Sequence, residues 1–375
     1  MIHEKYENDL NIISNARTVY IYGAGDVSRE VYFCLSSKTF CVDVSAFLVS
    51  SISDVTPEEI ENVPVMKYDD KRVDKDAVVI LAVLEKYRDE ICETLNSIGI
   101  ENRILLTFES DLWSLTRSRL FEQVCLEKRY PYLFRFDFTN NEIPDADNTN
   151  LMVYVTRSTK DKPLKTNFPK RPWEEEILAG AALDSLECEY VRDDEGDNIS
   201  NKNRKFCELT VMYWIWKNRD SDYVGLSHYR RRFDFTEDEI KKIVAEGFDA
   251  ILTVPMINVP NVRYMYGKNH YIDDWIKMID VVNKISPEYG RDIEVVEQSN
   301  YYIPYNMFIM KRNVFIKYCE WLFPILEGCE SLIGDYDDVY QNRYIGFLAE
   351  RLMTAYFYHH RDNMKIMICN KHFLE

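Results

Sequence analysis

The sequence has no apolar stretch long enough to cross a membrane. Its longest clean apolar run, Ala77 to Leu84, is far shorter than the roughly 20 residues that a membrane-spanning helix needs. The first residues, MIHEKYENDL, contain no basic segment followed by an apolar stretch, so we expect no secretory signal. We therefore expect a cytoplasmic protein, in contact with the inner face of the membrane only peripherally.

Paired cysteines and an excess of positive charge are also missing. The nine cysteines are scattered, odd in number and never spaced as CxxC, which is typical of a protein in the reduced cytosol. The formal net charge of −17 argues against bulk attraction to nucleic acid or to anionic lipid headgroups. We expect no nucleic-acid partner, although local basic clusters can still bind phosphate.

With 375 residues, the chain is long enough for two domains that each bury a core. A short strand at Val19 to Tyr22 ends in Gly23-Ala24-Gly25, and a helical pattern follows. Further expected elements are strands at 46–49, 77–83 and 104–106 and a helix at 86–98. This alternation predicts a small Rossmann-like domain over residues 1–108.

The glycine turn resembles the dinucleotide-binding fingerprint only weakly. Ser28 stands where the third glycine of G-x-G-x-x-G would be, and Leu48-Val49-Ser50 offers no acid for a ribose. Glycines also suit a tight turn without any ligand. NAD-dependent chemistry is therefore a minor alternative.

Residues 109–149 are expected to form a helical segment and a linker, the linker being rich in Asn and Asp from Asp137 to Asn150. A second α/β domain is expected over 150–375. Its first strand, Leu151 to Val155, leads into Thr156-Arg157-Ser158. The fold class we expect is thus α/β, a Rossmann-like domain followed by a second, larger α/β domain.

A cluster of cationic residues follows an apolar run at Tyr223 to Leu226. His228, Tyr229 and the three arginines 230–232 come directly after it. Arginine matches phosphate oxygens bidentately, and ligands of open α/β sheets lie beyond the carboxyl ends of strands. Ordinary salt bridges with the many carboxylates of this acidic chain are the alternative.

A second basic cluster precedes an expected helix over 204–217, whose apolar residues recur at helical spacing: Phe206, Leu209, Tyr213 and Trp216. Asn203 suits the N-cap. The cations Lys202, Arg204 and Lys205 crowd this end, where the helix dipole disfavours them and a bound anion would offset the cost. Otherwise they extend into water.

Four blocks in order resemble the DUF4422 family of bacterial polysaccharide glycosyltransferases, over roughly residues 150–370. They are GDNISNKNRKFCELTVMYWIWKN, DYVGLSHYRRRF, YNMFIMKRNVFIKYCEWLF and RYIGFLAERL. The resemblance implies a GT-A-like fold, a nucleotide-sugar donor, and a role in capsule, exopolysaccharide or O-antigen assembly. Relatives often show His-Lys where this chain has Arg157-Ser158, and HYRRYF where it has HYRRRF; these departures bear on the donor rather than on the class.

The residues carried over by resemblance are Asp197, Asn198, Asn203, Glu208, His228, Arg230, Arg231, Asn306, Glu350 and Arg351. We expect the donor to be bound by Thr156, Asn198, Lys202, Asn203, His228, Arg230 and Arg231, with the last two clamping the diphosphate. Candidates for the general base are Asp197, Glu208 and Glu350. His270, Asn306 and Arg351 are candidates for contact with the acceptor or a sugar.

No cofactor is certain, because HYRR stands where many enzymes of this architecture carry a metal-binding Asp-x-Asp. Mg or Mn remains an alternative, held by the acids at 193, 194 and 197 or by those at 335, 337 and 338. The expected partners are a nucleoside-diphosphate sugar, with a UDP-hexose as first guess, and a glycan or lipid-linked glycan acceptor. A non-catalytic nucleotide-sugar-binding or assembly subunit is the alternative function.

Overall fold

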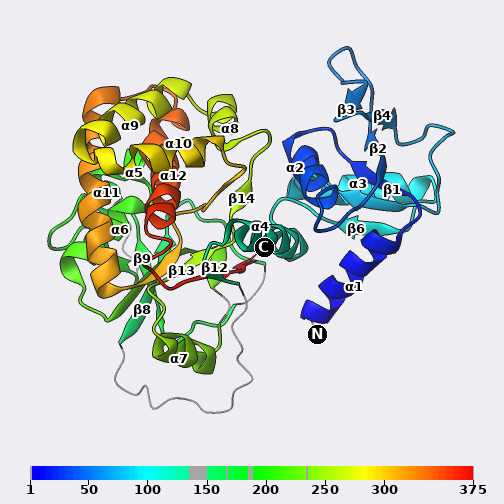
Figure 1. Cartoon of the computed structure of the whole chain (residues 1–375). Coiled ribbons are helices and arrows are strands. Elements are labelled where there is room, and N and C mark those ends of the chain that lie inside the picture. Colours follow the sequence, from blue (N-terminus) through cyan, green and yellow to red (C-terminus); the bar gives the residue numbers. More distant parts are fainter. Residues whose placement is uncertain (1, 135–149, 166–167, 185–188, 234, 375) are drawn as a thin grey trace. The chain divides into compact units, whose positions relative to one another are not determined.

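The computed structural model describes residues 2–134, 150–165, 168–184, 189–233 and 235–374. The chain divides into two compact units, Met1–Val124 and Cys125–Glu375 (Figure 1). The linker expected at 137–150 lies outside the described residues except for Asn150. Each unit has its own sheet flanked by helices, so the expected α/β class is confirmed.

The first unit contains a six-stranded sheet in the order β3-β4-β2-β1-β5-β6. Its strands are β1 (Val19–Tyr22), β2 (Val44–Val49), β3 (Glu59–Ile60), β4 (Val63–Lys67), β5 (Val78–Leu81) and β6 (Arg103–Leu105). All neighbours are parallel except β3 and β4. The strand order reverses beside β1, as in a doubly wound sheet.

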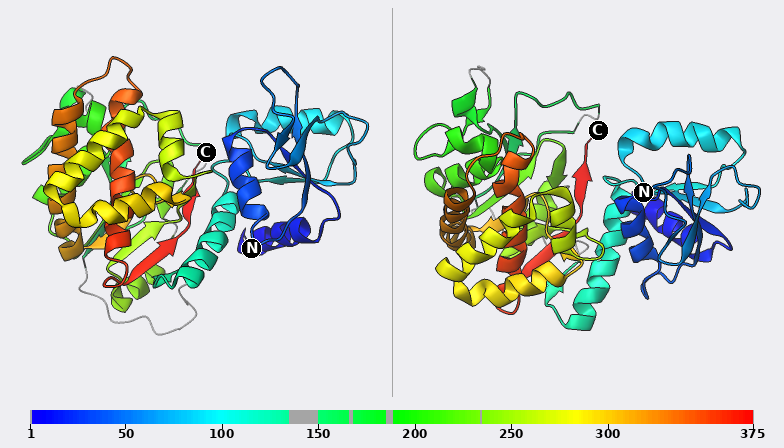
Figure 2. Two further views of the ribbon diagram at one scale, coloured as in Figure 1. Left: turned by 45° about the horizontal axis from the view of Figure 1, so that its top comes forward. Right: turned by 90° about the horizontal axis from the view of Figure 1, so that it is seen from above.

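Helices cover both faces of this sheet (Figure 2). They are α1 (Ile2–Asn15), α2 (Asp26–Leu35), η1 (Glu85–Tyr87), α3 (Arg88–Ser97) and α4 (Asp111–Lys128). Ile91 and Leu95 of α3 pack in one cluster with Tyr20 and Leu48. On the other face, the Tyr32 ring of α2 lies 5.6 Å from that of Phe47.

The glycine turn after β1 is explained by packing. Gly23 has a φ of +117°, and a Cβ there would lie 2.4 Å from Ser28 Oγ. Ser28 Oγ donates a hydrogen bond to the Ala82 carbonyl just after β5, at 2.9 Å. Ser28, in place of the third glycine, thus joins α2 to the end of a neighbouring strand.

Helix α4 is the helical segment expected within residues 109–149, and most of it belongs to the first unit. Trp113 and Arg117 are almost fully buried. Arg119 forms an ion pair with Glu7 of α1. The physical reason is that α4 buries a large aromatic side chain, which a solvated connection would leave exposed.

The second unit is built on a ten-stranded sheet whose main path is β10-β9-β8-β11-β16-β13-β17-β7. Its strands are β7 (Tyr132–Leu133), β8 (Leu151–Arg157), β9 (Glu174–Leu178), β10 (Val191–Arg192), β11 (Tyr223–His228), β12 (Arg231–Phe233), β13 (Ala250–Thr253), β16 (Phe308–Lys311), β17 (Ile366–Cys369) and β18 (Lys371–Phe373). The short pair β14 (Met256–Ile257) and β15 (Tyr301–Tyr302) is separate. Strand β11 is parallel to β8 and antiparallel to β16. The carboxyl ends of β8 and β11 therefore lie at the same edge as the start of β16.

The helices of this unit are α5 (Asn203–Phe206), α6 (Leu209–Asn218), α7 (Glu237–Glu246), α8 (Val262–Asn269), α9 (Ile272–Ile285), α10 (Gly290–Gln298), α11 (Arg312–Ile333) and α12 (Tyr344–His359). Short 3-10 turns are η2 (Ala181–Leu183), η3 (Ser200–Lys202), η4 (Pro287–Tyr289) and η5 (Gln341–Arg343). Within the described ranges, no helix is long and apolar enough to cross a membrane.

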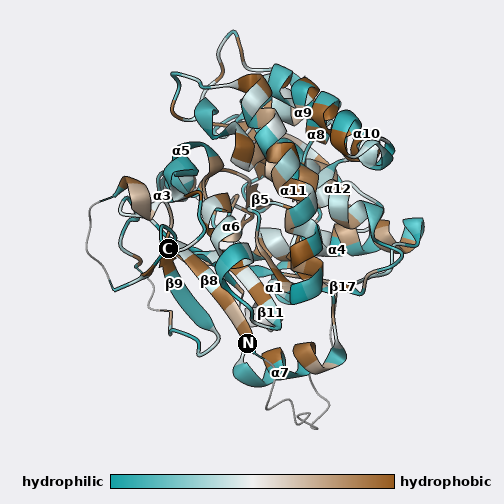
Figure 3. Cartoon of the chain, turned by 90° about the vertical axis from the view of Figure 1, so that its left-hand side faces the viewer, coloured by the Kyte–Doolittle hydropathy of each residue, from teal (hydrophilic) through white to brown (hydrophobic). Residues whose placement is uncertain are grey.

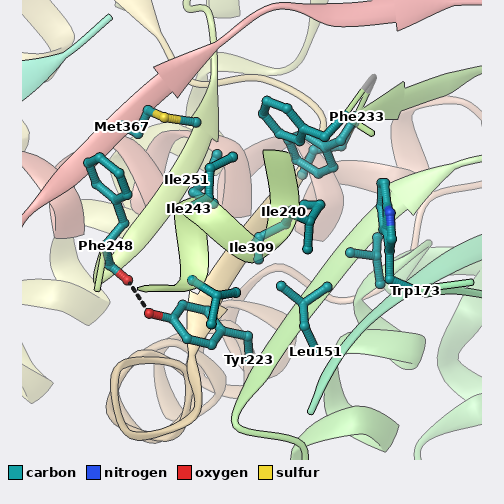
Figure 4. Packing of buried hydrophobic residues seen from close by; sticks show 14 residues of the cluster. Leu151, Trp173, Tyr223, Phe233, Ile240, Ile243, Phe248, Ile251, Ile309 and Met367 are labelled. Carbon is teal, nitrogen blue, oxygen red and sulfur yellow. Dashed lines mark hydrogen bonds between the residues drawn. The ribbon is translucent and has the colours of Figure 1, made fainter. Parts of the chain in front are cut away.

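The two faces of the second sheet are buried by different helices. On one face, Ile240 and Ile243 of α7 join a core with Leu151 and Ile309, and Tyr223 Oη donates to the Phe248 carbonyl at 3.0 Å (Figure 4). On the other face, Tyr154 contacts Trp214 of α6. Strand β8 is largely hydrophobic whereas β9 is mostly hydrophilic (Figure 3), as expected for a strand buried on both faces and for a strand nearer the edge.

The single helix expected over 204–217 is wrong. Helix α5 ends at Phe206, Cys207 has a φ of +52°, and α6 starts at Leu209. A positive φ at a residue with a side chain breaks the helical hydrogen-bond ladder. Asn203 donates from Nδ2 to the Cys207 carbonyl at 2.8 Å, which fixes this break. The apolar spacing continues across the break, so periodicity alone could not detect it.

Candidate functional site

The site starts where β8 and β11 end side by side. The parallel register pairs Thr156 with His228. Thr156 Oγ1 lies 3.3 Å from His228 Nδ1, and His228 Nε2 donates to the Tyr305 carbonyl at 2.7 Å. Burial lowers the pKa of His228, so the ring is neutral near pH 7 with its proton on Nε2. With both nitrogens engaged, His228 positions Tyr305 rather than offering a nitrogen to a ligand.

Tyr305 and Asn306 form a left-handed turn just before β16, with φ values of 71° and 51°. The Tyr305 amide donates to Glu350 Oε1 at 2.5 Å. Asn306 Nδ2 donates to Glu208 Oε1 at 2.7 Å and lies 3.3 Å from the Gly346 carbonyl of α12. Asparagine is one of the few residues that adopts this conformation readily, so one turn joins both carboxylates to the sheet edge.

Glu208 lies at the helix break, directly before α6. Its Oε1 accepts the hydrogen bond from Asn306. In the part of the chain that the structure describes, no donor contacts its Oε2, and the residue is only half-buried. Glu208 therefore has one fixed oxygen and one that a ligand can reach.

Glu350 is held differently. Its Oε2 accepts from Arg351 Nη1 at 2.7 Å, while Oε1 accepts from the Tyr305 amide. Arg351 also donates to the Phe347 carbonyl at 2.9 Å and lies 4.0 Å from the Tyr302 ring centroid. Burial raises the pKa of Glu350, and Arg351 opposes the rise. Glu350 and Arg351 thus form an ion pair that supports the Tyr305 turn.

Two cations lie beside this cluster. The Arg231 guanidinium is 4.4 Å from the centroid of the Tyr305 ring. Arg343 donates from Nε to Cys207 Sγ at 3.1 Å, next to Glu208. Burial and the Glu208 charge raise the pKa of Cys207 to about 11, so it is a neutral thiol. Arg343 was missed from sequence, although it is the first residue of RYIGFLAERL; its place just before an apolar helix was the available signal.

Arg230 and Arg232, the neighbours of Arg231, lie in other surroundings. The Arg230 backbone carbonyl accepts from the Leu374 amide at 2.8 Å. Burial raises the pKa of Asp161, and the positive charge of Arg230 partly opposes this rise. Arg232 pairs with the buried Glu174 at 3.5 Å. Of the three adjacent arginines, only Arg231 reaches the Tyr305 turn.

Three of the expected site residues have local structural partners instead. Asp197 accepts from Tyr213 Oη at 3.3 Å. Asn198 donates to the carbonyls of Asp194 and Gly196. Asn203 donates to the Cys207 carbonyl and to Thr210 Oγ1. The N-cap role expected for Asn203 is also wrong, because Lys202 occupies that position and makes no side-chain cap.

The cations before α5 do not require an anion. Lys202 Nζ forms an ion pair with Glu330 at 2.7 Å, and Lys205 pairs with Glu330 at 3.4 Å and with Asp335 at 2.7 Å. Helix α5 comprises only four residues, so its dipole is small. The expectation of an anion site at this helix start is not supported by the geometry.

His270 lies beside the cluster, after α8. Its ring centroid is 4.0 Å from that of Phe347 and 5.7 Å from that of Tyr340. Burial lowers the pKa of His270 to about 4, and the charges of Arg351 and Arg343 add to the effect. His270 is therefore a neutral ring near pH 7, in contact with other aromatic rings.

Neither acid cluster considered for Mg or Mn is arranged as a metal site. Asp193 accepts from the amides of Gly180 and Ala181, each at 2.9 Å, and from Thr210 Oγ1 at 2.7 Å. Asp194 pairs with Arg192. Among the residues described, no group of three His, Cys, Asp or Glu side chains could hold a metal ion. Asp193 and Asp194 instead fix loops of the second unit.

Comparison with known proteins supports the resemblance. Residues 160–361 match the model of a domain of unknown function, DUF4422. Among solved structures, the apo structure of the WbbM bifunctional glycosyltransferase is similar, with 29% identity, a TM-score of 0.54 and 60% of this chain covered. The match spans 46% of that protein, less than half of its length. No curated protein matches the chain significantly. Because the family match covers more than half of the sequence, the chain belongs to the DUF4422 family.

Proposed function

We propose that this protein is a glycosyltransferase that moves a sugar from a nucleoside-diphosphate sugar to a growing bacterial surface glycan. The similarity to WbbM, a bifunctional glycosyltransferase 29% identical over 60% of this chain, is the observation that carries the class. A UDP-hexose is the donor that we propose to test first. The acceptor is a glycan or lipid-linked glycan of a capsule, exopolysaccharide or O-antigen, reached at the inner face of the membrane.

The general base in this proposal is Glu208. In a single displacement, the acceptor hydroxyl gives its proton to Glu208 Oε2 and its oxygen bonds to the anomeric carbon. The bond from that carbon to the diphosphate breaks, and its electron pair leaves with the nucleoside diphosphate. A base needs an oxygen that the acceptor can approach. Glu208 has one, whereas both oxygens of Glu350 are engaged.

The leaving diphosphate gains negative charge, which preorganised cations stabilise. We propose that Arg230 and Arg231 bind it, as expected from sequence, and that Arg343 adds positive charge on the Glu208 side. Arg231 beside Tyr305 and Arg343 beside Cys207 support the assignment of these two residues. Arg230, which lies in other surroundings, is proposed from the sequence alone. Arg351 has a different role, because its ion pair with Glu350 supports the Tyr305 turn.

The first test combines donor binding with turnover. Sugar nucleotides of UDP, GDP, CDP and dTDP, with NAD and NADP, are screened by thermal shift in Mn and in EDTA, because a ligand of the native state raises its stability. We expect one sugar nucleotide to stabilise the wild type and Arg72→Ala, but not Arg231→Ala. Arg72 is a suitable control because its side chain is 73% exposed and pairs with Asp70, two residues away in the first unit.

Release of nucleoside diphosphate from the same donor would then mark an enzyme. Binding without release for any acceptor would favour the alternative, a non-catalytic nucleotide-sugar-binding or assembly subunit. A response to NAD or NADP alone, lost when Gly25 is substituted, would refute the proposal and move the function to the first unit.

A further inference from the structure

Three aromatic rings lie in mutual contact beside the candidate site, and one of them is exposed at the protein surface. This aromatic stack consists of Phe347 on α12, His270 after α8, and Tyr340 before η5. The centroids of Phe347 and His270 are 4.0 Å apart, those of His270 and Tyr340 5.7 Å, and those of Tyr340 and Phe347 5.2 Å. Tyr340 is 50% exposed, and the other two rings are half-buried.

The inner end of the aromatic stack touches the residues that surround Glu208. The Phe347 carbonyl accepts from Arg351, which holds Glu350. The Arg343 guanidinium lies 5.7 Å from the Phe347 ring, and Arg343 Nε contacts Cys207, the residue before Glu208. The aromatic stack is therefore linked to Glu208 through Arg343 and Cys207, and its Tyr340 ring is exposed to solvent.

The chemistry of these rings suits a sugar. The axial C–H groups of a pyranose form an apolar face that packs on an aromatic ring, while its hydroxyls need polar partners at the rim. His270 is neutral, so its ring offers an aromatic face, and no charge has to lose its hydration when a ligand packs on it. A single exposed tyrosine is ordinary. Three rings that contact one another beside a proposed active site instead provide a surface on which a sugar ring can pack.

We propose that the aromatic stack is the acceptor subsite, where a pyranose ring of the acceptor glycan packs against Tyr340 and directs a hydroxyl toward Glu208. The proposal rests on the transferase function proposed above, since a subsite needs a reaction to serve. It extends that function by naming the class of acceptor, a neutral pyranose, and the ring that binds it.

The test measures binding, so it does not depend on turnover. The full chain is mixed with the methyl pyranosides of galactose, glucose and N-acetylglucosamine, each at millimolar concentration, and saturation-transfer NMR detects which sugar protons contact the protein. Tyr340→Ala removes the outer ring and Tyr340→Phe keeps it. Tyr264→Ala is the matched control, because Tyr264 is 56% exposed on α8 and takes part in no ring contact among the described residues.

We expect at least one pyranoside to bind the wild type, Tyr340→Phe and Tyr264→Ala, with about fivefold or greater weakening in Tyr340→Ala. In turnover, Tyr340→Ala should raise the acceptor KM by a similar factor and leave the thermal shift by the donor unchanged. Equal signals in Tyr340→Ala and wild type, or no pyranoside signal from the wild type, would overturn the proposal. If no sugar nucleotide binds or reacts, the proposed function itself is refuted. If the donor binds normally but Tyr340→Ala leaves the acceptor KM unchanged, only the acceptor subsite is refuted.

Discussion

Replacing Glu208 by glutamine should separate catalysis from stability. The side-chain carbonyl oxygen of the introduced glutamine can still accept the hydrogen bond that Asn306 Nδ2 donates at 2.7 Å. The new amide group can take the place of Oε2, which contacts no donor among the described residues and can be reached by solvent. The fold around the helix break should therefore persist. What is lost is the ability to accept a proton.

The expected loss follows from that single change. A positioned base contributes roughly 10²- to 10⁴-fold to the rate, so kcat for Glu208→Gln should fall by about this factor, or about 3–5 kcal/mol in barrier height. The melting temperature and the donor affinity should stay close to the wild-type values. Removing this charge should also lower the pKa of Glu350, which Glu208 helps to raise.

Glu350→Gln is the matched comparison, since its two oxygens each accept from a donor, the Tyr305 amide and Arg351 Nη1. An amide has only one acceptor oxygen, so its NH2 group must face one of these donors. The Arg351 side chain is only 6% exposed and would lose its charged partner, at a cost of about 3 kcal/mol. The melting temperature of this unit should then fall by about 6–12 °C.

The assay measures nucleoside-diphosphate release at saturating donor and acceptor, together with thermal melting of both variants. Glu208→Gln should be inactive and stable, and Glu350→Gln should be clearly less stable. If Glu208→Gln keeps kcat within a few-fold of the wild type, Glu208 is not the base. If the melting temperature of Glu208→Gln is as low as that of Glu350→Gln, the inference that Glu208 Oε2 accepts no hydrogen bond in the folded protein is wrong.

Three further predictions concern packing, pH and metal. A Cβ at Gly225 would lie 2.7 Å from Val153 Cγ2 and 2.9 Å from the Phe308 carbonyl, so Gly225→Ala should cost about 1–3 kcal/mol in denaturant unfolding, and unchanged stability would refute this. Folding lowers the pKa of His270 from 6.5 to about 4, so between these pH values the unfolded chain binds a proton at His270 that the folded protein does not bind. The free energy of unfolding should therefore drop as the pH falls from 6.5 to 4, and His270→Gln should make this drop smaller. EDTA should barely reduce turnover if cations stabilise the diphosphate, and loss of activity restored by Mn would show the opposite.

Several features of the fold were predictable because they depend on local sequence. The runs at 19–22 and 151–155 are strands, since buried parallel strands require continuous apolar residues. The interpretation of the glycines as residues of a tight turn is also confirmed, because Gly23 has a positive φ, which glycine adopts without strain. The ends of elements were less certain: β11 continues to His228, two residues beyond the apolar run.

The break between α5 and α6 shows the limit of periodicity. Apolar residues recur through it, and only the positive φ of Cys207 and the hydrogen bond from Asn203 reveal two helices. The break matters for the site, because it places Glu208 at the start of α6, next to Asn306. Likewise, the adjacent arginines form one cluster in the sequence but not in the structure, because successive residues of a strand face opposite sides of the sheet. Arg232 is buried against Glu174, whereas Arg231 lies over Tyr305.

The sequence by itself determined the α/β class, the resemblance to the DUF4422 family, and the residue types available for chemistry. Only the tertiary structure decided which of them meet. Glu208, His228, Asn306 and Glu350 come together because a parallel register pairs the ends of β8 and β11 and a left-handed turn before β16 accepts hydrogen bonds from one side and donates them to the other. Such long-range pairing depends on sheet order and burial, which no local spacing encodes.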